Sequence, residues 1–272
     1  MSGSRDIWEI TQEVKNLPKL NDPVFIEGLP GIGNVGKIAV DFLAEELKAV
    51  KLFSFFSYRF PHSVFVNEEN MVEMPRIDIY YKKFRGKDKR DLVLLTGDLQ
   101  PIDEESCYSF CDEVIKIAKN LGCKEIVTTG GIGLQNAPEK PRVYCTGNDE
   151  KLMKKYIKKG IMVERDIFGV VGPIVGASGL LVGLGNLRKI SGVALLAETF
   201  GHPMYLGIKG AKEILKVLDD QLNIGINFKK LNKEVVDLEK EVMKRTKDWA
   251  AASSKGKMEV AGAKKKEASY IG

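Results

Sequence analysis

The stretch VFIEGLPGIGNVGKIA at residues 24–39 decides the predicted fold. Its first five residues are an apolar run that ends in glycine, which predicts a short buried β-strand. Residues 36–47 place Ile38, Phe42 and Leu43 on one helical face and therefore predict an α-helix. A buried strand followed at once by a helix is the building unit of α/β proteins.

The same alternation continues along the 272-residue chain. We expect further strands at 50–58, 64–66, 77–82, 91–96, 125–131, 142–146, 162–164 and 193–199, and helices at 104–121 and 211–222. Apolar strands that alternate with helices indicate a parallel sheet covered on both faces. The hairpin-like region 64–96 indicates that part of the sheet is mixed. We therefore predict an α/β fold with a mixed, mostly parallel sheet flanked by helices.

Residues 167–187 carry no charged side chain and are long enough to cross a bilayer. Six glycines and a proline interrupt this stretch, which makes poor lipid-facing material. We expect a loop followed by a buried, glycine-rich helix that packs closely on the sheet. A membrane span is the alternative, and we expect no membrane partner.

Charge and cysteine content narrow the class of protein. The net charge is +5, and residues 253–272, with five lysines and two glutamates, contribute +3 of it. This distribution lacks the basic face typical of nucleic-acid binding, so we expect no nucleic-acid partner. Four cysteines in a chain of this length do not indicate a disulfide framework, and residues 1–15 lack the apolar region of a signal peptide. These features predict a reduced, cytoplasmic setting.

The character of the sequence changes after residue 222. An apolar seam with spacings of four and three predicts an amphipathic helix at 223–250, through Ile224, Phe228, Leu231, Val235, Leu238 and Val242. This helix either packs back on its own domain or forms an oligomer contact. Residues 251–272 are rich in Ala, Ser, Gly and Lys, which predicts a flexible tail. The predicted organisation is an α/β domain at 1–222, the helix, and the tail.

The glycines Gly31, Gly33 and Gly36 have the spacing of a dinucleotide fingerprint and stand between a strand and a helix. Free amides at a helix N-terminus suit a phosphate. The second strand does not end in the acidic residue that would hold a ribose; it leads to Arg59, which could meet a 2′-phosphate instead. The alternative is that these glycines only allow a tight turn and close packing.

Polar residues also stand at the ends of predicted strands, where open α/β sheets bind ligands. Asp98 and Glu198 are candidates for a general acid or base, with Arg142 as an anion clamp. The alternative is that such carboxylates cap the following helices. The candidate ligand crevice comprises Gly31, Gly33, Asn34, Gly36 and Asp98.

Histidine and cysteine give little support to catalysis or metal binding. His62 and His202 each neighbour a proline, which is typical of turns. Cys107 and Cys111 lie four residues apart in a predicted helix without further ligands at suitable spacing, so we expect them to be small buried side chains. We predict no catalytic residue, no metal site and no cofactor.

Residues 25–39 closely resemble the opening motif of the proteasome assembly chaperone family. Further family-like motifs follow in order over residues 20–222: LTGDLQP at 95–101, IVTTGG at 126–131, PRVY at 141–144, the glycine-rich region 169–185, LLAETFG at 195–201 and AKEIL at 211–215. The resemblance implies a fold related to nucleoside phosphorylases, used without known catalysis. It also implies an archaeal-type protein. In this family, eukaryotic relatives help proteasome α-subunits to assemble, and archaeal relatives self-associate.

Some archaeal relatives engage the proteasome through a C-terminal tail that ends in a hydrophobic residue, tyrosine and any residue. This chain ends in ASYIG at 268–272, so Tyr270 is third from the end and follows Ser269. The resemblance therefore makes Tyr270, Ile271 and Gly272 candidate partner-binding residues, while an incidental tail or a tail for another partner remains the alternative.

The sequence thus predicts a non-catalytic homo-oligomer that acts as an assembly chaperone or adaptor. Its expected partners are itself and proteasome α-subunits or another assembly factor. One alternative is an enzyme or binding protein for a nucleoside or small anionic ligand at the crevice between Gly31–Gly36 and Asp98. Another is a scaffold unrelated to proteasomes.

Overall fold

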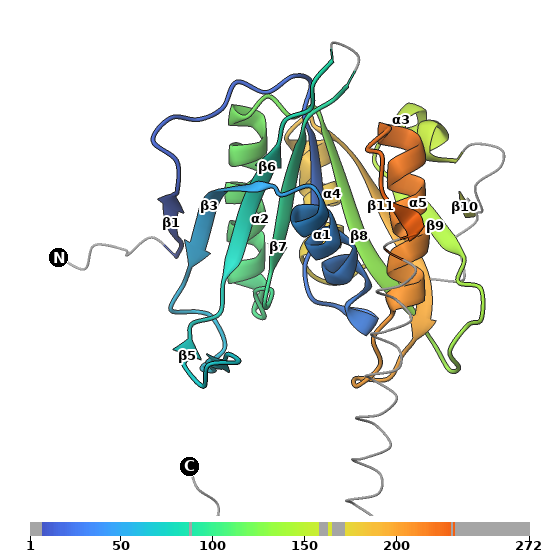
Figure 1. Ribbon diagram of the computed structural model, residues 1–272, viewed down its shortest axis with the longest axis horizontal. Coiled ribbons are helices and arrows are strands. Elements are labelled where there is room, and N and C mark those ends of the chain that lie inside the picture. Colours follow the sequence, from blue (N-terminus) through green and yellow to red (C-terminus); the bar gives the residue numbers. More distant parts are fainter. Residues whose placement is uncertain (1–6, 87–88, 158–162, 165–171, 230, 232–272) are drawn as a thin grey trace, which may run out of the picture. The chain divides into compact units, whose positions relative to one another are not determined.

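The computed structural model describes residues 7–86, 89–157, 163–164, 172–229 and 231. The chain divides into two compact units, residues 1–226 and residues 227–272. In the described part of the first unit, a nine-stranded sheet has the order β1-β3-β6-β7-β2-β8-β11-β9-β10. Figure 1 shows this sheet with helices on both of its faces.

The strands of the large sheet are β1 (Glu9–Gln12), β2 (Val24–Gly28), β3 (Val50–Phe56), β6 (Ile77–Lys82), β7 (Leu92–Gly97), β8 (Glu125–Leu134), β9 (Val143–Gly147), β10 (Val163–Glu164) and β11 (Ser191–Phe200). A separate two-stranded hairpin is formed by β4 (Phe65–Val66) and β5 (Val72–Glu73). The helices are α1 (Val35–Glu46), α2 (Glu104–Asn120), α3 (Glu150–Tyr156), α4 (Ala177–Leu187) and α5 (Ile208–Leu222), and a 3₁₀ turn, η1 (Ile32–Asn34), precedes α1.

The predicted strands and helices are confirmed to within a few residues at their ends. The strand over residues 24–28 is β2, and the helices expected at 36–47, 104–121 and 211–222 are α1, α2 and α5. The sequence reading missed β1, β5 and α3. The overall α/β class with helices on both faces is therefore as predicted.

The sheet is mixed, but the expectation that it is mostly parallel was wrong. The central strands β7, β2, β8 and β11 pair in parallel, and β9 pairs in parallel with β10. The remaining four pairings are antiparallel. Strand direction depends on how the connections run. The connections β3–β6 and β6–β7 contain no helix, so these strands return antiparallel, whereas the connection from β9 to β11 contains α3 and α4.

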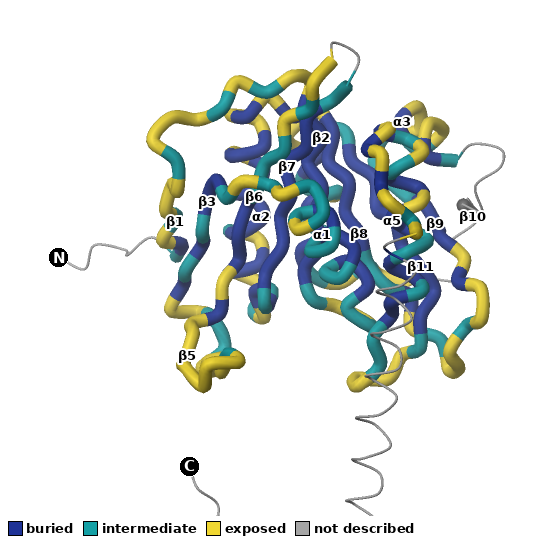
Figure 2. Tube along the Cα trace, in the orientation of Figure 1, coloured by how far each residue is buried: buried dark blue, intermediate teal, exposed yellow. Residues whose placement is uncertain are grey.

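Two helical layers sandwich the sheet. Helices α1 and α5 pack together on one face, and α2 and α4 pack together on the other (Figure 1). Between the second pair and the sheet lies a large apolar core, which is visible as the buried strands of Figure 2. Phe110 on α2 is fully buried in this core, with its ring centroid 5.1 Å from that of Trp8 and 5.4 Å from that of Phe55.

Helix α2 has clear local start and stop signals. Asp103 is its N-cap, and the Asp103 Oδ1 atom accepts a hydrogen bond of 2.9 Å from the Ser106 backbone N–H. Gly122 follows the helix with a φ of 83°, in the left-handed region that glycine adopts without strain. Gly122 therefore provides a strain-free end to α2.

The uncharged stretch at 167–187 contains helix α4, as predicted for its second half, while residues 165–171 lie outside the described residues. Ala177 and Leu181 are fully buried on the face that α4 turns inward. Within the described residues, the helices are all too short or too polar to span a membrane.

The second unit is described only at residues 227–229 and 231. Phe228 and Leu231, the first two residues of the apolar seam in this unit, are helical. Val235, Leu238 and Val242, together with the tail residues Tyr270, Ile271 and Gly272, lie outside the described residues.

Candidate functional site

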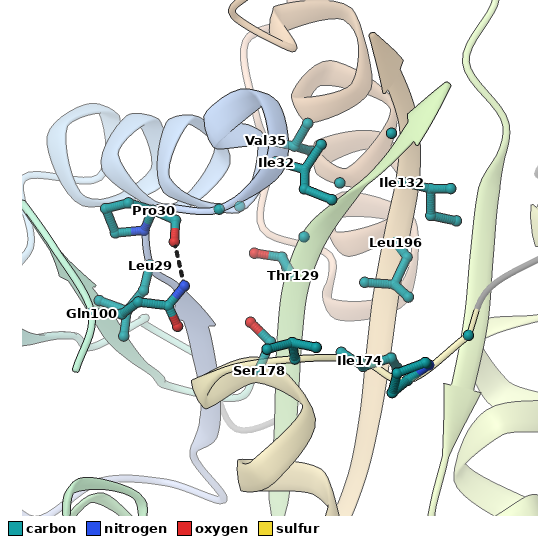
Figure 3. A pocket seen from close by; sticks show the side chains of 18 residues that line it. Leu29, Pro30, Ile32, Val35, Gln100, Thr129, Ile132, Ile174, Ser178 and Leu196 are labelled. Carbon is teal, nitrogen blue, oxygen red and sulfur yellow. Dashed lines mark hydrogen bonds between the residues drawn. The ribbon is translucent and has the colours of Figure 1, made fainter. Parts of the chain in front are cut away.

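A cavity of about 480 Å³ lies at the carboxyl ends of the central parallel strands. Figure 3 shows Ile32 and Val35 on one side of it, and Ile174 and Ser178 on the opposite side. The residues between β2 and α1, the Gly130–Gly133 stretch of β8 and the segment that leads into α4 form most of its wall. This is the region in which open α/β sheets place ligands.

Close backbone packing explains two of the glycines beside this cavity. A Cβ atom on Gly36 would lie 2.3 Å from the Thr129 carbonyl oxygen, so the first turn of α1 touches β8 directly. A Cβ atom on Gly28 would lie 2.2 Å from the Gly36 carbonyl oxygen. In contrast, a Cβ atom on Gly31 would meet nothing within 4 Å. Within the motif, Gly36 is therefore required for close packing, whereas Gly31 leaves open space.

The polar side chains in the cavity wall are already engaged by the protein. Gln100 donates from Nε2 to the Pro30 carbonyl oxygen (2.8 Å, Figure 3) and accepts through Oε1 from the Ala177 backbone N–H (3.1 Å). Thr129 Oγ1 donates to the Glu27 carbonyl oxygen at 2.8 Å. The lining residues that the structure describes include no charged side chain. The cavity therefore offers an anionic ligand no side-chain cation.

A buried carboxyl group lies directly behind the cavity wall. Glu27 on β2 is fully buried, and its Oε1 accepts hydrogen bonds from the Leu29 backbone N–H (2.9 Å) and from Ser178 Oγ (3.3 Å), both on lining residues. Its Oε2 atom has no hydrogen-bond partner among the described residues. Burial raises the pKa of Glu27 to about 7, and the hydrogen bonds from Leu29 and Ser178 offset only part of this effect.

A second, smaller hollow of about 230 Å³ lies on the other side of the glycine motif. Gly31, Gly33 and Asn34 line it, together with residues around His202. Gly33 has a φ of 62°, and Asn34 has a φ of 50°, so two consecutive left-handed residues form the turn. His202 Nδ1 accepts a hydrogen bond from the Met204 backbone N–H, consistent with its predicted place in a turn.

The predicted crevice residues do not all lie at one site in the structure. Gly31 and Gly36 line the larger cavity, Gly33 and Asn34 line only the smaller hollow, and Asp98 lines neither. Instead, Asp98 Oδ2 accepts a hydrogen bond of 3.0 Å from the Arg76 backbone N–H.

Arg59, the candidate for a 2′-phosphate, is also engaged elsewhere. Its Nη1 atom lies 2.8 Å from Glu105 Oε2, and it follows β3, which β6 and β7 separate from β2. The dinucleotide geometry would need the second strand beside the first. The placement of β3 thus favours the packing interpretation of the glycine motif.

Glu198 and Arg142 form a pair that joins β11 to the start of β9. Arg142 donates to Glu198 Oε1 from Nε (2.8 Å) and from Nη2 (2.6 Å), and its backbone N–H donates to Oε2 (3.0 Å). Burial raises the pKa of Glu198, but the hydrogen bonds and positive charge of Arg142 outweigh it and leave the pKa below its ordinary value. An ionised carboxylate clamped in this way suits a structural link between strands better than proton transfer.

The four cysteines are free and buried, which confirms the expected burial of Cys107 and Cys111. Burial raises the pKa of the Cys145 thiol to about 12, which keeps it protonated and unreactive. His, Cys, Asp and Glu side chains do not gather into a group of three suited to a metal ion anywhere in the described residues.

Sequence reasoning missed Glu27, Ser178, Thr129 and Gln100. Glu27 gave a signal that could have been used, because it is the one charged residue in the apolar run at 24–28. Its partner Ser178 is 151 positions away in the chain, and no local pattern joins the two.

The architecture defines the class: an α/β protein with a mixed sheet, a tightly packed glycine turn after its central strand, and a cavity lined by uncharged described residues. The chain belongs to the PAC2 family, which matches residues 25–246. The resemblance to proteasome assembly chaperones is thereby confirmed.

Individual relatives agree with this assignment. An uncharacterised protein of Methanocaldococcus jannaschii, MJ1210, is 31% identical over 235 residues, which span 86% of this chain and 87% of the relative. The crystal structure of Pyrococcus furiosus PbaB, described as an archaeal proteasome activator, is similar with a TM-score of 0.79 and 33% identity, over 89% of this chain and all of PbaB. P. furiosus PbaA, described as an archaeal homologue of proteasome-assembly chaperone, shares the fold with a TM-score of 0.69 and 22% identity, over 93% of this chain and 98% of PbaA.

Proposed function

We propose that this chain is a non-catalytic, homo-oligomeric cytoplasmic protein that acts as an assembly chaperone or adaptor for proteasome α-subunits. The observation that carries the proposal is the likeness to PbaB, a proteasome activator, over its whole length at 33% identity. Membership of the PAC2 family supports it independently. Protein contacts, and not chemistry at the crevice, are the basis of the activity.

The state of the candidate catalytic groups supports a non-catalytic role. A general acid or base must reach the proton that it moves. Glu198 is instead held by Arg142, and Asp98 accepts from the Arg76 backbone. Glu27 is the group with an altered pKa near the cavity, yet the lining residues Leu29 and Ser178 cover it.

Surface plasmon resonance with immobilised archaeal proteasome α-subunits tests the proposal. The full chain is expected to bind, and removal of residues 268–272 is expected to weaken binding at least tenfold if Tyr270 and Ile271 are the docking residues. The matched control removes residues 259–263, which shortens the tail equally and keeps its last five residues. Absence of binding by the full chain would favour a scaffold unrelated to proteasomes.

The cavity supports one second candidate, the binding of a small ligand. A volume of about 480 Å³ falls in the range of small-molecule sites, roughly 300–1,000 Å³. The lining favours an uncharged nucleoside over a nucleotide, because the described wall lacks a cation. Calorimetric titration with adenosine and with AMP tests this candidate, and an Ile174→Trp variant, which fills the cavity, is the control. Equal absence of heat with both compounds would exclude these two ligands.

A further inference from the structure

The segment 62–74 is an exposed apolar surface built on the β4–β5 hairpin. Within it, Asn67 alone is partly covered and the other residues are exposed, as the tube of Figure 2 shows around β5. Six large apolar side chains are between 46% and 66% exposed: Val64, Phe65, Val66, Met71, Val72 and Met74. A concentration of this kind on a folded chain marks an interaction surface.

The hairpin is nevertheless ordered by its own polar turn. The Asn67 side-chain oxygen accepts hydrogen bonds from the backbone N–H groups of Glu69 (3.0 Å) and Met71 (2.9 Å). The Asn67 amide nitrogen donates to Glu73 Oε1 at 2.8 Å. A two-stranded hairpin without a buried face is marginal by itself. The hydrogen bonds of Asn67 therefore hold the hairpin, and with it the exposed apolar side chains, in a fixed arrangement. Packing among these side chains alone would not do so.

The charge on this surface identifies the chemistry of its partner. Residues 62–74 contain Glu68, Glu69 and Glu73 and neither lysine nor arginine, so the segment carries −3 on a chain of net charge +5. Arg76, just beyond the segment, lies 3.9 Å from Glu73 Oε2, so Glu68 and Glu69 carry the negative charge that is offered to a partner. Complementary charge at the rim of an interface speeds association and excludes partners of like charge. The surface thus fits an apolar patch with a basic rim.

We propose that the β4–β5 hairpin docks a protein partner whose contact surface has an apolar centre rimmed by lysine and arginine. Two copies of this hairpin do not fit each other, because a two-fold contact would bring Glu68 and Glu69 of both copies around one apolar patch. Phe65 and Met71 are the expected anchors, since aromatic and methionine side chains are enriched at interface centres. The inference goes beyond the proposed function because it names a surface within the folded unit and does not require the partner to be proteasomal.

Site-specific photo-crosslinking in native cells tests the inference with the full chain. The photoreactive residue p-benzoylphenylalanine replaces Met71 in the hairpin or, as a matched control, Leu187 at the end of α4, which is 72% exposed. Mass spectrometry then identifies the crosslinked peptide. We expect one protein crosslinked from position 71 and not from position 187, at an apolar site flanked by lysine and arginine.

Charge reversal gives the second readout. Glu68→Lys with Glu69→Lys is expected to lower the crosslinking yield from position 71 at least tenfold. Glu9→Lys with Glu139→Lys changes the net charge equally at exposed sites outside the hairpin and is expected to leave the yield unchanged. Circular dichroism confirms that each variant is folded.

Three results would overturn the inference. The first is equal crosslinking from positions 71 and 187, and the second is a crosslinked peptide that comes from a second copy of this chain. The third is a crosslinking yield from position 71 that does not change on charge reversal at positions 68 and 69. A crosslink to a proteasome α-subunit would support the proposed function as well. A crosslink to another basic protein would uphold the docking surface and leave the proposed function to its own binding test.

Discussion

Replacement of Glu27 by glutamine is expected to stabilise the protein at alkaline pH. Glu27 is fully buried on β2. Its Oε1 atom accepts hydrogen bonds from the Leu29 backbone N–H and from Ser178 Oγ, and its Oε2 atom has no hydrogen-bond partner in the described structure. The amide of Glu27→Gln keeps the shape and the acceptor oxygen but never ionises. The variant therefore removes the free-energy cost of burying a charge, and it places an amide NH2 group at one of the two oxygen positions.

The magnitude follows from the pKa of the folded state. Burial raises the pKa of Glu27 to about 7 from an ordinary value of 4.5. Below pH 4.5 the carboxyl is protonated in both the folded and unfolded states, so wild type and variant have similar stability. Between pH 4.5 and 7 the unfolded state loses its proton first, so the free energy of unfolding of the wild type falls as pH rises, by about 3 kcal/mol in total.

The assay is urea and thermal unfolding of wild type and Glu27→Gln at pH 4.5, 6 and 8. At pH 8 the variant should be about 3 kcal/mol more stable, which for a folded unit of this size is roughly 6–12 °C in Tm. At pH 4.5 the two proteins should be nearly equal.

Glu198→Gln is the matched control, for which the expected change in stability at pH 8 has the opposite sign. The pKa of Glu198 is lowered, so its ionised form stabilises the fold above the ordinary pKa, and this contribution is lost as pH falls. Glu198→Gln should therefore be destabilised at pH 8, with the difference shrinking toward acid pH. The reasoning on Glu27 is refuted if its variant differs from wild type equally at pH 4.5 and 8, or is the less stable protein at pH 8.

Two further predictions concern packing and assembly. Gly36→Ala should lower the free energy of unfolding in urea by about 1–3 kcal/mol, because the new Cβ atom would lie 2.3 Å from the Thr129 carbonyl oxygen. Gly31→Ala, with open space around the new Cβ atom, should change it by less than about 0.5 kcal/mol. Equal losses in the two variants would contradict the packing role of Gly36. If the apolar seam after residue 222 forms an oligomer contact, Val235→Asp with Leu238→Asp should lower the mass measured by light scattering to that of the monomer, and an unchanged mass with lowered stability would indicate packing on the own domain.

The local features of the fold were predictable because they depend on neighbours in sequence. The apolar run at 24–28 became β2, and Asp103 and Gly122 marked the ends of α2 through capping and left-handed geometry. Helix α3 was missed because seven residues give little periodicity. Its cap was a usable signal, since Asp149 accepts hydrogen bonds from the backbone of Lys151 and Leu152.

Features that depend on long-range contacts could not be predicted. The directions of β3, β6 and β9 depend on how the chain returns to the sheet, which the alternation of strands and helices does not encode. The sheet edge predicted to hold the crevice does carry a cavity, but Asp98, which was assigned to it only from its position after a strand, does not line that cavity. The Arg76 backbone, 22 residues earlier, holds that carboxylate outside the cavity.

Native mass spectrometry of the full chain co-expressed with archaeal proteasome α-subunits tests the central claim most directly. The proposed function predicts a homo-oligomer of this chain in a complex of defined stoichiometry with α-subunits. A spectrum that shows the homo-oligomer and the α-subunits only as separate species, at concentrations that allow micromolar binding, would contradict it.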